Sequence, residues 1–190
     1  MSELRTVAVV LAGGVGSRVG LSIPKQLIKI AGRPIIEHTI ETLDASPLVD
    51  EIIVMMTPGH LDPVQELVDR GGYTKVTRVL PGAETRNGTT VRALEAIGEE
   101  ECNVLFHDAV RPLLSQRIIE ECVAALATYE AVDTAIPSAD TIIEVDEHEV
   151  IQDVPKRAML RRGQTPQGFR RSVIARAYEI AATDPDFTAT

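Results

Sequence analysis

The fold is most constrained by a run of four aliphatic residues, residues 7–10, that leads directly into the glycine-rich segment 11–18. A continuous aliphatic run of this length predicts a strand buried on both faces, as in parallel sheets. The glycines then lie where this strand ends, and they let the backbone approach an anion closely. Arg18 and Lys25 would add two cations to the same small volume. This combination predicts a phosphate-binding loop that suits the build-up of negative charge in a transition state.

The rest of the chain repeats the alternation of strand and helix. This order predicts an α/β fold, a doubly wound, mostly parallel sheet with helices on both faces. A composition with 44% hydrophobic but only 3% aromatic residues agrees, because it indicates a core of aliphatic side chains. Further strands are expected at residues 51–56, 75–80, 103–106 and 131–136, and helices at residues 34–43, 61–70, 91–97, 115–128 and 172–182.

Residues 141–145 and 150–154 break this rhythm. They alternate between polar and apolar side chains around an acidic turn, which predicts a β-hairpin that projects from the sheet. An isolated hairpin is only marginally stable, so this arm is expected to pack on a partner such as a second subunit. We therefore expect a single domain over residues 1–190 that carries a hairpin arm at about residues 139–158.

Two common glycine motifs do not fit the loop after the first strand. The dinucleotide fingerprint fails because Val19 stands where its third glycine belongs, and because the second predicted strand ends at Met56 and Thr57 without an acidic residue. The phosphate loop of nucleotide triphosphatases fails because Lys25 follows Pro24 rather than a glycine at the required spacing. An ordinary glycine turn remains the alternative for the loop by itself.

Charge and cysteine content limit the classes of partner. A net charge of -9 and a pI near 5.0 argue against general affinity for nucleic acid or for anionic membranes. The two cysteines form no C-x-x-C pair and are expected to be reduced core residues. No apolar run approaches the length of a membrane span. These features favour a cytoplasmic protein that captures any anionic ligand with a few well-placed cations.

Residues 81–90, after the third predicted strand, offer a second ligand loop. Their glycines, guanidinium, amide and hydroxyls could read the edge of a base, and the helix that follows adds oriented N–H groups. The alternative is a simple capped loop, with Asn87 or Thr89 as the N-cap of that helix.

Asp108 ends the fourth predicted strand and is the candidate metal ligand. A carboxylate that faces a phosphate loop can hold Mg²⁺, which prefers carboxylate and phosphate oxygens. The alternative is that Asp108 pairs with Arg111 or caps the helix that begins near Ser115. His107 has the wrong chemistry for Mg²⁺ and is expected to orient the loop.

Six motifs in order along the chain resemble one family, the cytidylyltransferases that make CDP-linked sugar alcohols. The motifs are residues 11–18, Pro24-Lys25-Gln26, residues 82–89, residues 107–112, Asp140-Thr141 and residues 164–167. The resemblance implies transfer of CMP from CTP to a polyol phosphate, with release of pyrophosphate. The acceptor is D-ribitol 5-phosphate in one branch and 2-C-methyl-D-erythritol 4-phosphate in the other. Val110 favours the ribitol branch, because the other branch tends to have a second alanine there; the methylerythritol branch is the alternative.

The resemblance also implies roles for individual residues. Arg18 and Lys25 would be catalytic at the α-phosphate of CTP, and Asp108 would coordinate Mg²⁺. It implies homodimers built partly on the hairpin arm, which would bring Arg157 near the neighbouring subunit's site. Nucleotide binding is expected at Leu11, Ala12, Gly13, Gly14, Gly82, Ala83, Glu84, Arg86, Asn87, Thr89 and Ala109, and acceptor binding at Arg111, Thr141, Arg157 and Thr165.

The family continues beyond the length of this chain with a further metal-binding aspartate, a substrate-facing lysine and closing sheet elements. We therefore expect the C-terminal end of the family domain to be absent from these 190 residues. A nucleotide-binding regulator without catalysis is the rival from another class. Such a protein would keep a nucleotide loop, but it would not need Arg18, Lys25 and Asp108 together.

Overall fold

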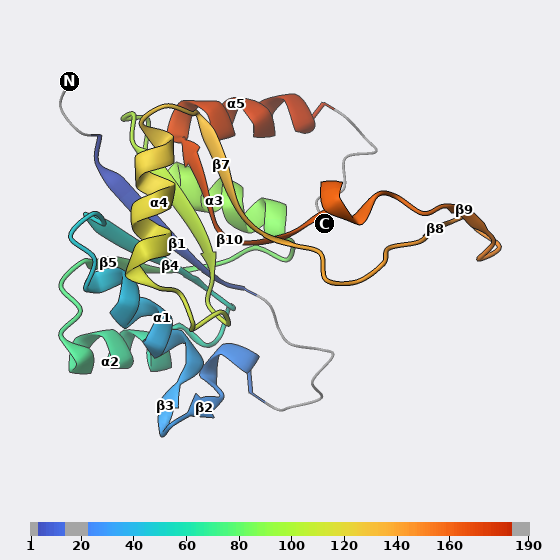
Figure 1. Cartoon of the computed structure of the whole chain (residues 1–190). Helices are drawn as coiled ribbons and strands as arrows, with labels where there is room; N and C mark the ends of the chain where they lie inside the picture. The colour runs from blue at the N-terminus through green and yellow to red at the C-terminus, as the bar shows by residue number, and fades with distance from the viewer. Residues whose placement is uncertain (1–3, 14–22, 184–190) are drawn as a thin grey trace.

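The computed structural model describes residues 4–13 and 23–183, which form a six-stranded sheet covered by helices on both faces (Figure 1). The strand order is β5-β4-β1-β6-β10-β7, and the pairs β5–β4, β4–β1 and β1–β6 are parallel. β10 runs antiparallel to both β6 and β7. This arrangement confirms the predicted doubly wound, mostly parallel sheet. The strands are β1 (Thr6–Ala12), β4 (Glu51–Met56), β5 (Val76–Pro81), β6 (Asn103–Asp108), β7 (Ala131–Pro137) and β10 (Arg161–Arg170).

The central strand β1 separates two apolar cores. Ala8, Val10 and Ala12 pack on the face that is covered by α1 (Ile35–Asp44), α2 (Leu61–Gly71) and α4 (Gln116–Leu126). Val7 and Val9 point to the opposite face, which is covered by α3 (Arg86–Ile97) and α5 (Arg171–Ala181). Because alternate residues of a strand point to opposite faces, only a continuous apolar run can supply both cores.

The predicted arm is confirmed as a hairpin that extends away from the sheet (Figure 1). Its strands β8 (Glu144–Val145) and β9 (Ile151–Asp153) are shorter than the period-two pattern predicts. The Asp146 carboxylate closes the turn, since it accepts hydrogen bonds from the backbone N–H groups of His148 and Val150. The remaining short elements are η1 (Lys25–Leu27), β2 (Lys29–Ile30), β3 (Arg33–Pro34) and η2 (Arg157–Met159).

One prediction of secondary structure is wrong, and one strand is missed. The helix predicted at residues 91–97 begins at Arg86, because the Thr85 hydroxyl caps it by accepting a hydrogen bond from Gly88 N at 3.0 Å. Asn87 and Thr89, the expected caps, therefore lie inside the helix. β10 is a strand that the sequence does not predict, since its glycines, glutamines and proline show no apolar alternation.

No helix among residues 4–13 and 23–183 has the length and apolar character that a membrane span requires.

Replacing Gly168 with alanine is expected to destabilise the sheet. The new methyl carbon would lie 2.7 Å from Val132 and 3.1 Å from both Leu105 and Leu126, in space that is already filled. Overpacking of this kind lowers the free energy of unfolding by ~1–3 kcal/mol. Gly163→Ala, in the same strand, is the matched control, because its methyl group meets one carboxylate oxygen at an ordinary 3.5 Å. Urea denaturation of both variants would measure the difference, and equal losses would contradict the packing argument.

Candidate active site

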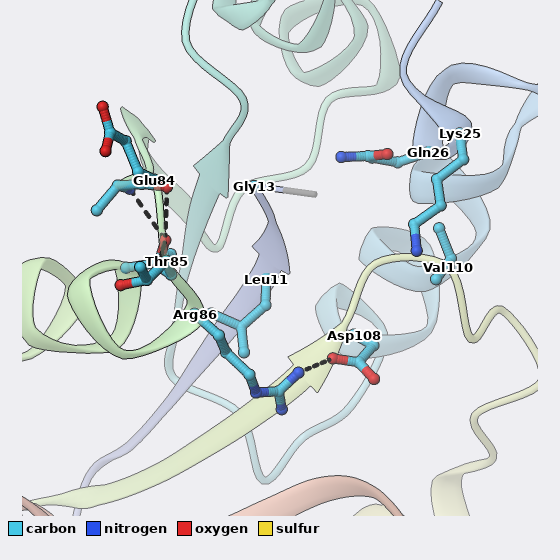
Figure 2. Close-up of a pocket in the computed structure, with 11 residues that line it drawn as sticks. Leu11, Gly13, Lys25, Gln26, Glu84, Thr85, Arg86, Asp108 and Val110 are labelled. Carbon is cyan, nitrogen blue, oxygen red and sulfur yellow. Dashed lines mark hydrogen bonds and ion pairs between the residues drawn. The ribbon is translucent and has the colours of Figure 1, made fainter. Parts of the chain in front are cut away.

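A cavity of about 240 Å³ opens at the carboxyl edge of the sheet, between the ends of β1 and β6 and the start of α3 (Figure 2). Ligands of doubly wound sheets bind at this edge. Three segments that are far apart in the sequence therefore meet around one space. The lining residues are Leu11, Gly13, Lys25, Gln26, Ala83, Glu84, Thr85, Arg86, Thr89, Asp108 and Val110.

The loop that precedes α3 is held against the end of β1 by Thr89. The buried Thr89 hydroxyl accepts a hydrogen bond from Ala83 N at 2.9 Å and donates to the Thr85 carbonyl at 2.9 Å. A Cβ atom on Gly82 would lie 3.2 Å from Thr89 Oγ1 and 3.5 Å from Gly13 Cα. The two glycines thus allow the two loops to approach each other closely, as a backbone cradle for a ligand requires.

Gln26 positions Lys25. The buried Gln26 side chain donates a hydrogen bond to the Ala12 carbonyl, which also accepts one from Thr57 Oγ1 at 3.0 Å. This anchors η1 to the end of β1. The Lys25 ammonium points into the cavity on the side of Val110, and it makes no hydrogen bond or ion pair with any of the residues that the structure describes (Figure 2). Among the described residues, Lys25 is therefore a cation that is available to meet an anionic ligand.

Asp108 lies between two arginines. Its Oδ1 is 2.9 Å from Arg86 Nη1, and its Oδ2 is 2.9 Å from Arg111 Nε. Burial would raise the pKa of the Asp108 carboxyl, but the two guanidinium groups outweigh burial and hold this pKa below its usual range. The carboxylate is therefore ionised at neutral pH. The pairing of Asp108 with Arg111, which was the alternative to a metal-binding role, is present, and Arg86 is a second partner that the sequence did not indicate.

The turn that carries Arg111 is fixed by the buried His107. The imidazole Nε2 lies 3.0 Å from the Arg111 carbonyl and donates to it, and Arg111 N donates to the Asp108 carbonyl at 3.0 Å. Burial lowers the pKa of His107, so the ring is neutral at pH 7. This geometry agrees with the expectation that His107 orients the loop.

The Asp108 carboxylate could hold a magnesium ion whose other ligands come mainly from a bound phosphate ligand. An ionised carboxylate has about four acceptor sites, and the two arginine bonds use only two of them. The structure, as far as it is described, contains no group of three or more His, Cys, Asp or Glu residues suited to a metal. A magnesium ion at Asp108 would therefore take its other ligands from phosphates and water, as this ion commonly does.

The structure brings together most of the predicted nucleotide residues. Leu11, Gly13, Ala83, Glu84, Arg86 and Thr89 line the cavity together with Lys25 and Asp108. Ala12 and Ala109 are buried beside it, and Gly82 packs on Thr89. Asn87 is directed elsewhere, since its Oδ1 accepts a hydrogen bond from the Tyr178 hydroxyl at 3.4 Å. Gly14 and Arg18 lie outside the described residues.

The predicted acceptor residues are more dispersed. Thr165 is buried next to Asp108, whose backbone N–H donates to Thr165 Oγ1 at 3.3 Å. Arg111 reaches the same carboxylate from outside the cavity lining. Thr141 and Arg157 are exposed residues of the arm and do not line the cavity.

Sequence reasoning missed several residues at the site. Gln26 and Thr85 line the cavity, and Gln164 and Gln167 of β10 contact the two arginines. Gln26 and the two glutamines lie within motifs that carried the resemblance, which is the one signal that could have found them. Their side chains are neutral, so no charge pattern singled them out.

A cavity at the carboxyl edge of this sheet that is lined by glycine, Lys25 and Arg86 is typical of a nucleotide-binding enzyme of the nucleotidyltransferase class. Comparison with known families gives the particular group. The chain belongs to the IspD family, 2-C-methyl-D-erythritol 4-phosphate cytidylyltransferase, which matches residues 6–190. The resemblance drawn from the six motifs is thereby confirmed.

Individual relatives agree with this family. The chain is 47% identical over 192 residues to the 2-C-methyl-D-erythritol 4-phosphate cytidylyltransferase of Thermobifida fusca, covering 98% of this chain and 77% of the relative. It is 42% identical to a bifunctional ribulose 5-phosphate reductase/CDP-ribitol pyrophosphorylase of Haemophilus influenzae, covering 95% of this chain but 39% of that protein. A solved 4-diphosphocytidyl-2C-methyl-D-erythritol synthase of Anaerococcus prevotii superposes with a TM-score of 0.87 at 28% identity, covering 100% of this chain and 81% of that one.

Replacing Thr89 with valine is expected to loosen the loop over residues 82–85. Valine keeps the shape of threonine but leaves the Ala83 N–H without its partner, which should lower the free energy of unfolding by ~1–3 kcal/mol. Thr90→Val is the matched control, because the Thr90 hydroxyl donates to the Arg86 carbonyl within α3 and does not contact the loop over residues 82–85. Urea denaturation compares the two, and hydrogen exchange at Ala83 tests the location. A stability loss without faster exchange at Ala83 would contradict this role.

Proposed function

We propose that this chain transfers CMP from CTP to 2-C-methyl-D-erythritol 4-phosphate and releases pyrophosphate. The observation that carries the chemistry is the Lys25 ammonium, which is unpaired among the described residues and is directed into a cavity that Arg86 and Asp108 also line. Family membership supports CTP as the nucleotide.

The acceptor is revised from the one that the sequence favoured. Sequence motifs favoured ribitol 5-phosphate, but the family match and the Thermobifida relative both carry the methylerythritol name. Ribitol 5-phosphate is the second candidate, because the Haemophilus relative is a CDP-ribitol pyrophosphorylase. Val110 lines the cavity, so it is one position where the two acceptors could be distinguished.

The proposed reaction needs positioning and charge more than a general base. A phosphate monoester has a second pKa near ~6 and is mostly dianionic at pH 7, so it can attack the α-phosphorus of CTP directly. The negative charge that spreads over the phosphoryl oxygens must then be offset. Lys25 is available for this, and Arg18 is proposed to assist it. Backbone N–H groups of the two glycine loops would bind the nucleotide.

Magnesium is proposed as the cofactor, with Asp108 as its protein ligand. When bound, the ion would neutralise charge on the phosphate oxygens. Arg86 and Arg111 keep Asp108 ionised at neutral pH, and an ionised carboxylate is the form that can ligate the metal.

The hairpin arm is proposed as a dimer contact. A two-stranded hairpin is marginally stable alone, and this one exposes a row of apolar side chains that a second copy of the chain would cover. In such a dimer, the exposed Arg157 of one subunit would lie near the site of the other subunit. The apolar side chains, each 45–58% exposed, are Ile142, Ile143, Val145, Val150, Ile151 and Val154.

The proposed function is tested by pyrophosphate release from CTP and Mg²⁺ with each acceptor in turn. We expect turnover with 2-C-methyl-D-erythritol 4-phosphate at a kcat/KM at least tenfold above that with ribitol 5-phosphate, since a site built for one set of hydroxyls rejects another. A reversed preference would favour the second candidate. Binding of CTP without turnover on either acceptor would favour a regulator.

Replacing Lys25 with alanine is expected to lower kcat by about 10²–10³-fold, because one preorganised charge aimed at the transition state is removed. Lys29→Ala is the matched control, since Lys29 is exposed on β2 and does not line the cavity. Steady-state pyrophosphate release measures both variants. Near-normal turnover of Lys25→Ala would remove Lys25 from the mechanism.

A further inference from the structure

Two glutamines of β10 contact the arginines of the site and have no role in the proposed function. Gln167 Oε1 accepts a hydrogen bond from Arg86 Nη2 at 3.3 Å, and Gln164 Oε1 accepts one from Arg111 Nη1. Each guanidinium group is therefore held at two points, by the shared Asp108 carboxylate and by its own glutamine.

The shape of β10 makes this double contact possible. In a regular strand, residues three positions apart point to opposite faces, so residues 164 and 167 could not both reach the same cluster. The pairing of β10 with β7 is interrupted between Gly163 and Gln167, where the register shifts. This irregular stretch turns both side chains toward Asp108, at the place where bulges commonly re-aim side chains near active sites.

We propose that Gln164 and Gln167 are positioning residues that fix the planes of Arg111 and Arg86, and that they separately control binding of the acceptor phosphate and of the nucleotide. This inference rests on the proposed function. A guanidinium group held at one point can rotate, whereas one held at two points keeps its remaining N–H donors aimed in one direction.

The two amides hold the arginines without adding charge. Two arginines and one aspartate leave the cluster with one net positive charge, which is useful for binding phosphates. If carboxylates stood at positions 164 and 167, they would hold the arginines equally well but would reverse that charge. Amide oxygens hold the guanidinium groups without cancelling their attraction for a ligand.

The two arginines differ in position, so each glutamine is assigned to a different substrate. Arg86 lines the cavity beside residues 83–85, so Gln167 serves the nucleotide. Arg111 lies outside that lining and reaches the Gln164 end of β10, on the side of Thr165. Gln164 therefore serves the acceptor.

The test uses the isosteric variants Gln167→Met and Gln164→Met, with Gln65→Met as the control. Gln65 is exposed on α2, and its side chain donates a hydrogen bond to Asp69 at the surface. We expect Gln167→Met to raise KM for CTP about tenfold, because the charged Arg86 side chain loses one hydrogen bond. KM for the acceptor should stay within about twofold, because Arg111 keeps its bond to Gln164. Gln164→Met should show the reverse, and the control should change neither constant.

Gln167→Glu tests the role of charge at this position. It preserves an oxygen acceptor for Arg86, so the free energy of unfolding should stay at the wild-type value, while the added negative charge should raise KM for CTP about tenfold. An unchanged KM for CTP in this variant would contradict the role assigned to the neutral amide.

The outcomes distinguish the inference from the function on which it rests. A wild-type protein without pyrophosphate release on either acceptor overturns the proposed function, and the inference with it. An active wild-type protein whose Gln164→Met and Gln167→Met variants change both KM values equally, or neither, overturns the inference alone.

Discussion

The candidate site depends on one carboxylate, Asp108, and on the two guanidinium groups that it holds. The ion pair with Arg86 joins the end of β6 to the first turn of α3, and the ion pair with Arg111 holds the turn that follows β6. Because Asp108 is largely buried, these contacts act in a medium of lower dielectric than water and are correspondingly strong. Without Asp108, two arginines would face each other across the cavity edge, so the carboxylate is what allows so much positive charge to gather there.

This local charge opposes the charge of the whole molecule. The chain carries a net charge of -9, so the overall field repels a nucleotide triphosphate and a phosphorylated acceptor. Screening limits that repulsion to about 8 Å at physiological ionic strength, whereas Lys25 and Arg86 act within the cavity itself. Recognition of the anions is therefore a short-range matter, which explains why small changes in the aim of a guanidinium group should change affinity.

Local sequence signals predicted much of the fold and a part of the site. The run at residues 7–10 had to be buried on both faces, so β1 and the loop after it followed directly. The position of Asp108 followed from the end of β6 in the same way. β10 did not follow, because it enters the sheet through pairing with β6 and β7 rather than through its own apolar pattern. The start of α3 was missed because several neighbouring residues are able to cap a helix, and the sequence does not show that Thr85 is the one that does so.

The antiparallel strand β10 also explains why the site lies at the carboxyl end of β6. An antiparallel strand between β6 and β7 passes its irregular middle across the carboxyl end of β6. A parallel strand there would end at this edge and contribute only its following loop. β10 instead contributes Gln164, Thr165 and Gln167 from the body of the strand, where backbone pairing on both sides of the irregular stretch restrains them. Side chains mounted on paired backbone hold their direction better than side chains on a loop, so the arginines that must be aimed are supported from the sheet.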